Sequence, residues 1–289
     1  RVTRRSWSRH AATTPLLALA VVAVLAGGCG SDDTPSGAGS IPTDCGPAPE
    51  PTPLRAEVLA EHPHDPTAFT QGLVVVDGAL YESTGRRGRS SVREVDLDSG
   101  RVLRSTDLDP ELFGEGLTAV GDDRLVQLTW TEGRALVWNR SELTAVGEHR
   151  YDGEGWGIST LDDGRLVMSD GSDTLTVRDP DDFSVLERWQ ITRADGAADR
   201  LNELEWDGER LWANRWQTDE IVRIDLRCRR VDGVLDASAL TARAATAAAG
   251  RPIDVLNGVA HRPDSGDLLL TGKDWPLLFE VAVTEDARR

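Results

Sequence analysis

The chain has 289 residues and carries 49 acidic against 32 basic side chains, which gives a formal net charge of −17. That balance disfavours nucleic-acid binding, because phosphates require a basic surface. The hydrophobic fraction of 39% is enough for a folded core and is far below that of a multi-span membrane protein. Only three cysteines occur and none form a Cys-x-x-Cys pair, which disfavours a thiolate zinc site or a redox dithiol.

The N-terminal 28 residues have the layout of a secretory signal. Four arginines precede an apolar run over residues 16–25, which is too short for a transmembrane helix, and small residues follow. The run ends in Leu-Ala-Gly-Gly-Cys, which resembles a bacterial lipobox. We therefore expect lipidation of Cys29 and an extracytoplasmic lipoprotein of the cell envelope. The alternative is an ordinary secretory signal and a secreted protein.

Residues 29–53 are rich in Asp, Ser, Gly and Pro and predict a flexible tether, because such a segment buries little apolar surface. Outside the cytoplasm disulfides persist. Once Cys29 carries lipid, only Cys45 and Cys228 remain as thiols, so we expect a disulfide between them.

The remainder of the chain, residues 54–283, repeats itself. Five times a short polar segment containing Gly or Leu introduces an apolar strand, at residues 70–73, 114–117, 155–158, 202–205 and 257–260. Second strands follow at residues 79–84, 124–130, 165–170, 210–216 and 267–273. Third strands are expected at residues 92–97, 135–139, 174–178, 220–225 and 277–283. The first four copies add a fourth strand, at residues 102–108, 146–151, 185–191 and 231–235.

The fifth copy lacks a fourth strand, and residues 54–59 are available to supply it. Short alternating strands at this period predict an all-β fold, a five-bladed β-propeller closed by an N-terminal strand that completes the last blade. A sandwich or a solenoid is the competing architecture, although a solenoid would need caps that the sequence lacks. One helix is expected at residues 237–249, and residues 284–289 form a C-terminal tail.

Polar or aromatic residues begin each inner strand, where a repeat requires only Gly and a small apolar residue. In a propeller these positions converge on the central channel, which predicts a binding site there. They are Gln71, Glu115, Trp156, Asn202 and Asn257. The alternative is that these groups satisfy one another or bind water.

Tryptophan is unusually frequent, with nine Trp against two Tyr and four Phe. We expect ordinary packing for Trp138, Trp189, Trp206 and Trp212. Four others stand beside Gly and polar residues and predict an aromatic-lined cup for a small, partly polar group. Those four are Trp130, Trp156, Trp216 and Trp275.

Ten ordered strings extend over all five copies: FTQGL, YESTGRRGRS, FGEGLT, QLTW, GWGIS, MSDGS, LNELEW, ANRW, LNGVA and TGKDWP. Over residues 54–283 the chain resembles the plant and bacterial type of glutaminyl-peptide cyclotransferase. The resemblance implies a five-bladed propeller enzyme that converts N-terminal glutaminyl residues of peptides or proteins to pyroglutamate with release of ammonia. It implies no cofactor for the chemistry. Members of the family can carry a structural calcium in the channel, although no segment of this sequence has the spacing of a calcium-binding loop. The five histidines form no convincing zinc set.

The resemblance assigns proton transfer to Glu115. It assigns substrate recognition to Phe69, Gln71, Trp130, Trp156, Asn202, Trp216 and Lys273. The lone lysine, Lys273, is in addition expected to donate to the amide oxygen that gains charge, with a structural ion pair as its alternative. Glu203 and Glu205 are expected to support the site or to bind an ion.

The expected partner is a peptide or protein with an N-terminal Gln, and we expect a monomer that meets the membrane only through its lipid. A lipid-tethered propeller that binds a ligand or protein without turnover is the alternative function. A third hypothesis is a metal-dependent lactonase, in which Glu115, Asn202 and Asn257 would be the metal ligands. Glu115 in an intact FGEGLT motif favours the cyclase, because a binding module needs no general base.

Overall fold

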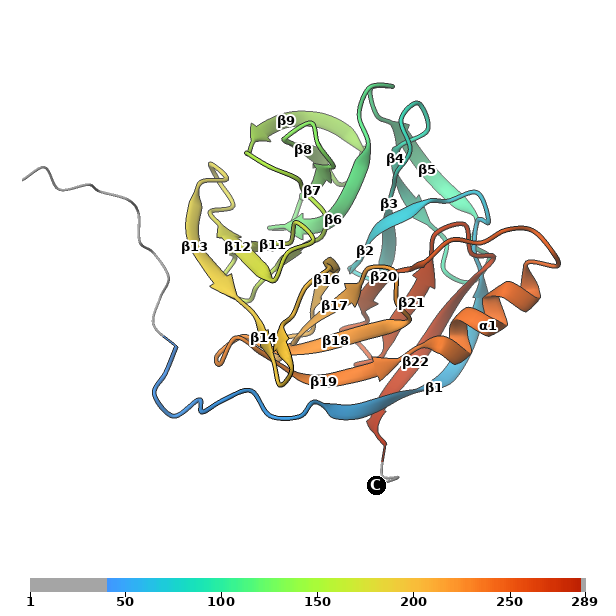
Figure 1. Cartoon of the computed structure of the whole chain (residues 1–289). Coiled ribbons are helices and arrows are strands. Elements are labelled where there is room, and N and C mark those ends of the chain that lie inside the picture. The colour runs from blue at the N-terminus through green and yellow to red at the C-terminus, as the bar shows by residue number, and fades with distance from the viewer. Residues whose placement is uncertain (1–40, 287–289) are drawn as a thin grey trace, which may run out of the picture. The chain divides into compact units, whose positions relative to one another are not determined.

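The computed structural model describes residues 41–286, which are built almost entirely of β-strands (Figure 1). The one helix among them is α1 (Ser238–Ala247), close to the helix expected from the sequence. None of these described residues form a helix long and apolar enough to cross a bilayer. The predicted all-β class is confirmed. The predicted signal, Cys29 and the first part of the predicted tether lie outside the described residues.

Residues 70–190 form three antiparallel four-stranded sheets, each with its strands in chain order. The first contains β2 (Thr70–Val76), β3 (Ala79–Thr84), β4 (Ser91–Val95) and β5 (Val102–Asp107). The second contains β6 (Gly114–Val120), β7 (Arg124–Thr129), β8 (Arg134–Asn139) and β9 (Thr144–Arg150). The third contains β10 (Ile158–Thr160), β11 (Leu166–Met168), β12 (Thr174–Arg178) and β13 (Val185–Gln190). Each predicted strand in this region is present, within a few residues of its expected bounds.

The other described strands join one ten-stranded sheet, in which the order is β16-β17-β18-β19-β1-β22-β21-β20. One half holds β16 (Leu201–Trp206), β17 (Leu211–Arg215), β18 (Glu220–Asp225) and β19 (Arg230–Asp236). The other half holds β20 (Leu256–His261), β21 (Leu268–Gly272), β22 (Leu277–Glu285) and β1 (Thr52–Pro63). A short hairpin, β14 (Thr192–Arg193) with β15 (Gly196–Ala197), extends from β19 and was not predicted.

The N-terminal strand β1 pairs with β22 in antiparallel orientation, as the missing fourth strand of the last copy was predicted to do. It is longer than predicted, and its first residues also pair with β19 in parallel orientation. That second pairing, which the repeat pattern does not contain, joins the fourth and fifth copies into one sheet. The outer edges of the two copies are paired with each other over three residues at this junction.

The first strands of the five copies lie against one another. Contacts link β2 to β6, β6 to β10, β10 to β16, β16 to β20, and β20 back to β2. Glycine permits this approach: a Cβ atom at Gly157 would lie 2.1 Å from the Asn202 carbonyl oxygen, and one at Gly116 would lie 2.7 Å from the Trp156 carbonyl oxygen. The Gly116 amide donates to that same Trp156 oxygen at 2.7 Å. The residue before each glycine is therefore held in a fixed place by close backbone contact.

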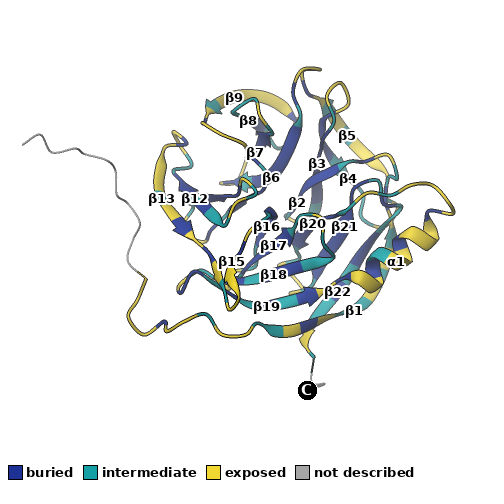
Figure 2. Cartoon of the chain, viewed as in Figure 1, coloured by how far each residue is buried: buried dark blue, intermediate teal, exposed yellow. Residues whose placement is uncertain are grey.

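Apolar side chains from adjacent sheets fill the space between them, and the outermost strands carry most of the exposure (Figure 2). Trp138, Trp189 and Trp212 are buried in these clusters, and Trp206 is half-buried against one of them. The prediction of ordinary packing for these four is confirmed.

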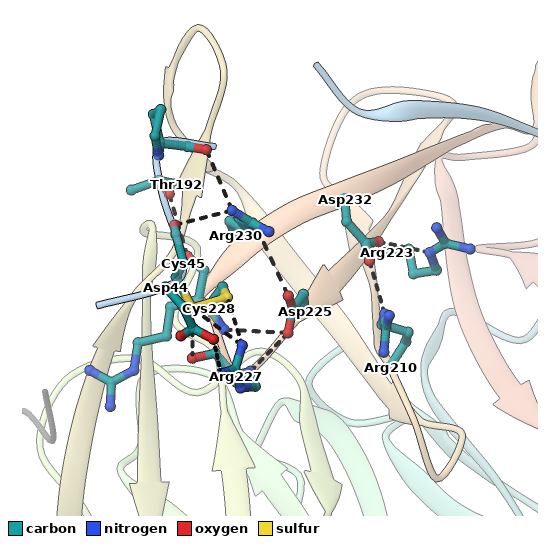
Figure 3. Close-up of polar contacts among 12 residues, drawn as sticks. Asp44, Cys45, Thr192, Arg210, Arg223, Asp225, Arg227, Cys228, Arg230 and Asp232 are labelled. Carbon is teal, nitrogen blue, oxygen red and sulfur yellow. Dashed lines mark hydrogen bonds and ion pairs between the residues drawn. A yellow bond between two sulfur atoms is a disulfide. The ribbon is translucent and has the colours of Figure 1, made fainter. Parts of the chain in front are cut away.

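The predicted disulfide between Cys45 and Cys228 is confirmed (Figure 3). Around it, Arg227 pairs with Asp44 at 2.6 Å, and Arg230 donates to the Cys45 carbonyl oxygen at 3.3 Å. These contacts fasten the segment before β1 to the turn between β18 and β19. They hold the start of β1 where its parallel pairing with β19 begins.

Candidate active site

A cavity of about 180 Å³ opens where the first strands of the copies meet. It is lined by Phe69, Gln71, Phe113, Glu115, Trp130, Trp156, Asn202, Trp216 and Lys273. All eight residues to which the resemblance assigns a role lie in this one lining. Phe113 is the ninth and was not expected.

The register of the first strands explains why these side chains converge. Gln71 on β2, Glu115 on β6 and Asn202 on β16 occupy equivalent positions of the repeat, and Trp156 occupies the same position just before β10. In the first two copies the residue two positions earlier also lines the cavity, and these residues are Phe69 and Phe113. Aligning the repeats at Phe69 would have identified Phe113 from the sequence.

Asn257, the fifth residue of that register, does not line the cavity. Its Nδ2 donates to the Gln71 Oε1 at 3.2 Å and to the Thr70 carbonyl oxygen at 3.1 Å. It therefore fixes which way the Gln71 amide faces, leaving Gln71 Nε2 free to donate into the cavity.

Glu115 is buried, with 5% of its surface exposed, and its Oε1 accepts a hydrogen bond of 2.9 Å from Gln71 Nε2. Burial raises the pKa of this carboxyl well above its ordinary value. The Lys273 ammonium opposes the rise, whereas the Glu132 and Glu154 carboxylates add to it. A carboxyl perturbed in this way, inside a cavity, is typical of a proton-transfer group.

Lys273 follows β21 and is 4% exposed. Its Nζ lies 4.9 Å from the centroid of the Phe69 ring. Burial lowers the pKa of Lys273, and the Glu115 carboxylate partly opposes that effect. The ammonium and the carboxylate thus face the same cavity without an ion pair between them within 4 Å, so both remain available to a third group.

Asn202 offers the cavity an unused acceptor. Its side chain is 3% exposed, and within the described part of the chain its buried Oδ1 has no hydrogen-bond partner. Leaving a buried amide oxygen unpaired costs free energy, so a ligand that donates to it gains binding energy there.

Aromatic rings enclose the mouth of the cavity in two edge-to-face groups. Phe113 lies between Phe69 and Trp130, with ring centroids 6.1 Å and 5.7 Å apart. In the second group the ring centroids of Trp156 and Trp216 are 5.3 Å apart. All five rings remain half-exposed, which suits a cup that closes over apolar methylene groups.

Trp275 does not belong to this cup, so that part of the prediction is wrong. It is fully buried, packs edge-to-face on Phe279 with centroids 6.3 Å apart, and donates through Nε1 to the Asp254 carbonyl oxygen at 2.9 Å. The turn at Asp274, whose φ is +62°, folds the ring back over Gly272. Backbone direction, which neighbouring Gly and polar residues do not reveal, decides where the indole points.

Glu203 and Glu205 lie outside the cavity lining and are buried. Glu203 accepts hydrogen bonds from the backbone amides of Leu73 and Val259, at 3.1 Å and 2.9 Å. Glu205 accepts from the His261 amide at 2.8 Å. Burial raises the pKa of both carboxyls, that of Glu205 to about 8.

The side chains around Glu203 form no cluster of carboxylates that points to a calcium site in the described part of the chain. Calcium takes six to eight oxygen ligands, and among residues 41–286 no group of three or more His, Cys, Asp or Glu side chains lies together. Both Glu203 oxygens already accept backbone hydrogen bonds. The expected calcium stays a prediction and enters no step below.

The chain is similar to known proteins over most of its length. The family model described as glutamine cyclotransferase matches residues 34–283. The chain is 41% identical to a glutaminyl-peptide cyclotransferase of Arabidopsis thaliana over 233 residues, which cover 79% of this chain and 71% of that protein. The crystal structure of Myxococcus xanthus glutaminyl cyclase matches with a TM-score of 0.76 and 39% identity, covering 82% of this chain and all of that one. The chain therefore belongs to the glutamine cyclotransferase family.

Proposed function

We propose that this chain is a glutaminyl-peptide cyclotransferase, which cyclises N-terminal glutaminyl residues of peptides to pyroglutamate and releases ammonia. Its family membership and its 41% identity to a curated enzyme of that name support the activity. The structural observation that carries the proposal is the gathering of Glu115, Lys273 and two amides within one aromatic-walled cavity.

The reaction is an intramolecular acyl transfer. The α-amine nitrogen attacks the γ-carboxamide carbon and forms the ring C–N bond, and the bond to the carboxamide nitrogen then breaks. One proton leaves the amine and one reaches the departing nitrogen, so that ammonia is released. Because the nucleophile is tethered to its electrophile, the enzyme has to fold the side chain, stabilise the oxygen that gains charge and move the proton.

Glu115 is the proposed proton carrier. It takes the proton from the attacking amine and returns it to the leaving nitrogen, which requires a group that is basic in one step and acidic in the next. The raised pKa of this buried carboxyl supports the role, because a general acid–base works best when its pKa lies near the working pH. The hydrogen bond from Gln71 holds one oxygen still while the other remains available.

Lys273 is the proposed donor to the amide oxygen as charge develops on it. Its ammonium is buried beside Glu115 and forms no ion pair within 4 Å among the described residues, which leaves its protons available to substrate. A fixed positive charge in a dry site stabilises an oxyanion far more than it would in water.

The two amides and the rings are the proposed recognition groups. Gln71 and Asn202 hold the substrate carboxamide and amine, and the unpartnered Asn202 Oδ1 is suited to accept from a substrate N–H. Phe69, Phe113, Trp130, Trp156 and Trp216 cover the side-chain methylenes and exclude water. Enclosure favours the folded conformer that closes the ring.

We further propose a five-bladed propeller as the architecture. The ring of contacts among β2, β6, β10, β16 and β20 supports it, as does the four-stranded unit that each of the five copies contributes. In the same way, the lipobox-like end of the signal supports an envelope lipoprotein. Replacing Cys29 with Ser should then release the protein from the membrane fraction.

The proposed activity is tested by mass spectrometry of a Gln-initiated peptide incubated with the purified protein. We expect the loss of one ammonia per peptide, and no loss from the same peptide with an acetylated N-terminus, because acetylation removes the nucleophile. Binding of the peptide without a change in mass would instead support the non-catalytic binding protein.

A further inference from the structure

Glu154 links two walls of the cavity without lining it. It lies in the connection between β9 and β10, and its Oε2 accepts hydrogen bonds from two indoles: Trp130 Nε1 at 2.7 Å and Trp156 Nε1 at 2.9 Å. Trp130 follows β7 of the second sheet, and Trp156 precedes β10 of the third. One carboxylate oxygen therefore ties together rings that neighbouring sheets contribute.

This hydrogen bonding sets the orientation of half-exposed rings that packing alone holds weakly. The terminal torsion of a tryptophan side chain is broad, so a rim indole needs a second restraint to keep one orientation. A charged acceptor gives short, strong hydrogen bonds. Trp130 is also in edge contact with Phe113, and Trp156 with Trp216, so Glu154 restrains four of the five rings directly or through a neighbour.

The charge of Glu154 is not neutralised nearby. Among the described residues no basic side chain pairs with it, whereas Glu132, the other rim carboxylate, pairs with Arg87. The substrate carries an α-amine with a pKa of ~8 and arrives largely as a cation near neutral pH, and it gives one proton to solvent before the neutral amine attacks. A carboxylate at the rim attracts such a cation toward the cavity.

We propose that Glu154 is a positioning residue for this reaction, which fixes the Trp130 and Trp156 rings through one carboxylate oxygen and draws the protonated N-terminus of the peptide into the cavity through its charge. The proposal rests on the cyclase activity proposed above. Glu154 itself touches no reacting atom. It acts on the substrate through the two rings that it orients and through the electrostatic attraction of its charge.

Two substitutions separate the two effects. Glu154→Gln keeps an amide oxygen that can accept from both indoles but removes the charge. Glu154→Ala removes both. The matched control is Asp152, an exposed carboxylate of the same connection with no hydrogen bond to an indole, changed to Asn and to Ala.

The ring-orienting effect is measured by near-UV circular dichroism and by steady-state kinetics on a Gln-initiated peptide. We expect Glu154→Ala to diminish the tryptophan bands and to raise KM about threefold to tenfold beyond Glu154→Gln, the size expected for a lost hydrogen bond, with little change in kcat. The Asp152 variants should match the parent. Equal spectra and equal KM values for Glu154→Ala and Glu154→Gln would overturn the ring-orienting role.

The charge effect is measured by the dependence of kcat/KM on salt concentration. A carboxylate attracts a cationic N-terminus less strongly at high ionic strength, so kcat/KM of the parent should fall as salt rises. This fall should be smaller in both Glu154 variants and unchanged in both Asp152 variants. A salt dependence in Glu154→Gln equal to that of the parent would overturn the charge effect.

Failure of the proposed function is distinguishable from failure of this inference. If the parent protein does not release ammonia from any Gln-initiated peptide, the cyclase proposal fails. The near-UV spectra of the four variants would still decide whether Glu154 orients the rings, since they require no turnover.

Discussion

Two buried carboxylates on the first strands of the repeats, Glu115 and Glu203, differ in what surrounds them. Glu115 stands just before the glycine of its copy and points into the cavity, beside an ammonium and the Gln71 amide. Glu203 stands where the four other copies have a glycine, namely Gly72, Gly116, Gly157 and Gly258. Both of its oxygens accept hydrogen bonds from backbone amides, one on β2 and one on β20. The two carboxylates thus occupy adjacent positions of the repeat. The first is available to substrate, whereas the second is hydrogen-bonded to the backbone.

The comparison shows that burial and a raised pKa do not by themselves identify a proton carrier, because both carboxyls have them. What distinguishes Glu115 is an oxygen that faces open volume. Glu203 instead occupies the space between first strands and satisfies amides that would otherwise be unpaired there. Substituting each carboxylate in turn tests this division between a reactive and a structural group.

The largest effect is expected for Glu115→Gln. The amide keeps the shape of the side chain but cannot accept and return a proton, so kcat should fall by ~10²–10⁴, equivalent to ~3–5 kcal/mol at the transition state. Thermal unfolding should match the parent, because no backbone group depends on this carboxylate. Turnover within threefold of the parent would remove Glu115 as the proton carrier.

Glu203→Gln should show the opposite pattern. An amide can accept from only one of the Leu73 and Val259 N–H groups and presents a donor to the other, so the free energy of unfolding should fall by about 1–3 kcal/mol. Turnover per folded molecule should stay within about threefold. Urea unfolding measures the free energy, and kcat divided by the folded fraction measures the turnover. A fall in kcat comparable to that of Glu115→Gln would contradict a purely structural role for Glu203.

Trp156→Ala tests whether the rings that line the cavity around Glu115 bind the substrate. The indole encloses the substrate in the ground state and the transition state alike, so we expect KM to rise about tenfold, ~1.4 kcal/mol, with a smaller change in kcat. Trp206→Ala is the control, since that ring lies outside the cavity lining and should affect stability without affecting KM. Unchanged kinetics for Trp156→Ala would remove this ring from the substrate cup.

A separate prediction concerns stability against pH and uses Glu205, whose pKa burial raises to about 8. Between the ordinary glutamate pKa and about 8 the folded state keeps a proton that the unfolded chain has lost. The free energy of unfolding should therefore fall as pH rises through this window. In Glu205→Gln that dependence should flatten, because the amide has no proton to lose. Urea midpoints at about pH 5.5 and about pH 8.5 test this, and parallel slopes for parent and variant would contradict it.

The sequence by itself determined much of the local structure. Alternation of apolar residues set the strands, and β3, β12 and β18 have the predicted bounds, because a side-chain period of two follows from the strand backbone itself. The count of thiols set the disulfide partners. The family resemblance carried by the motif strings placed eight of the nine cavity residues. The repeat register alone placed four of them, Gln71, Glu115, Trp156 and Asn202, since equivalent positions of a repeat converge when the repeats pack around one another.

The tertiary structure decided where side chains point after turns and which residues far apart in the chain meet. Trp275 turned into the core because the backbone at Asp274 reverses, and Glu154 acquired its two indoles because the β7 and β10 ends lie side by side. The parallel pairing of β1 with β19 likewise joins strands far apart in the chain. A sequence pattern reports which face of a strand is buried. It does not report where a turn sends the next side chain or which remote donor meets it, because those depend on the packing of whole sheets.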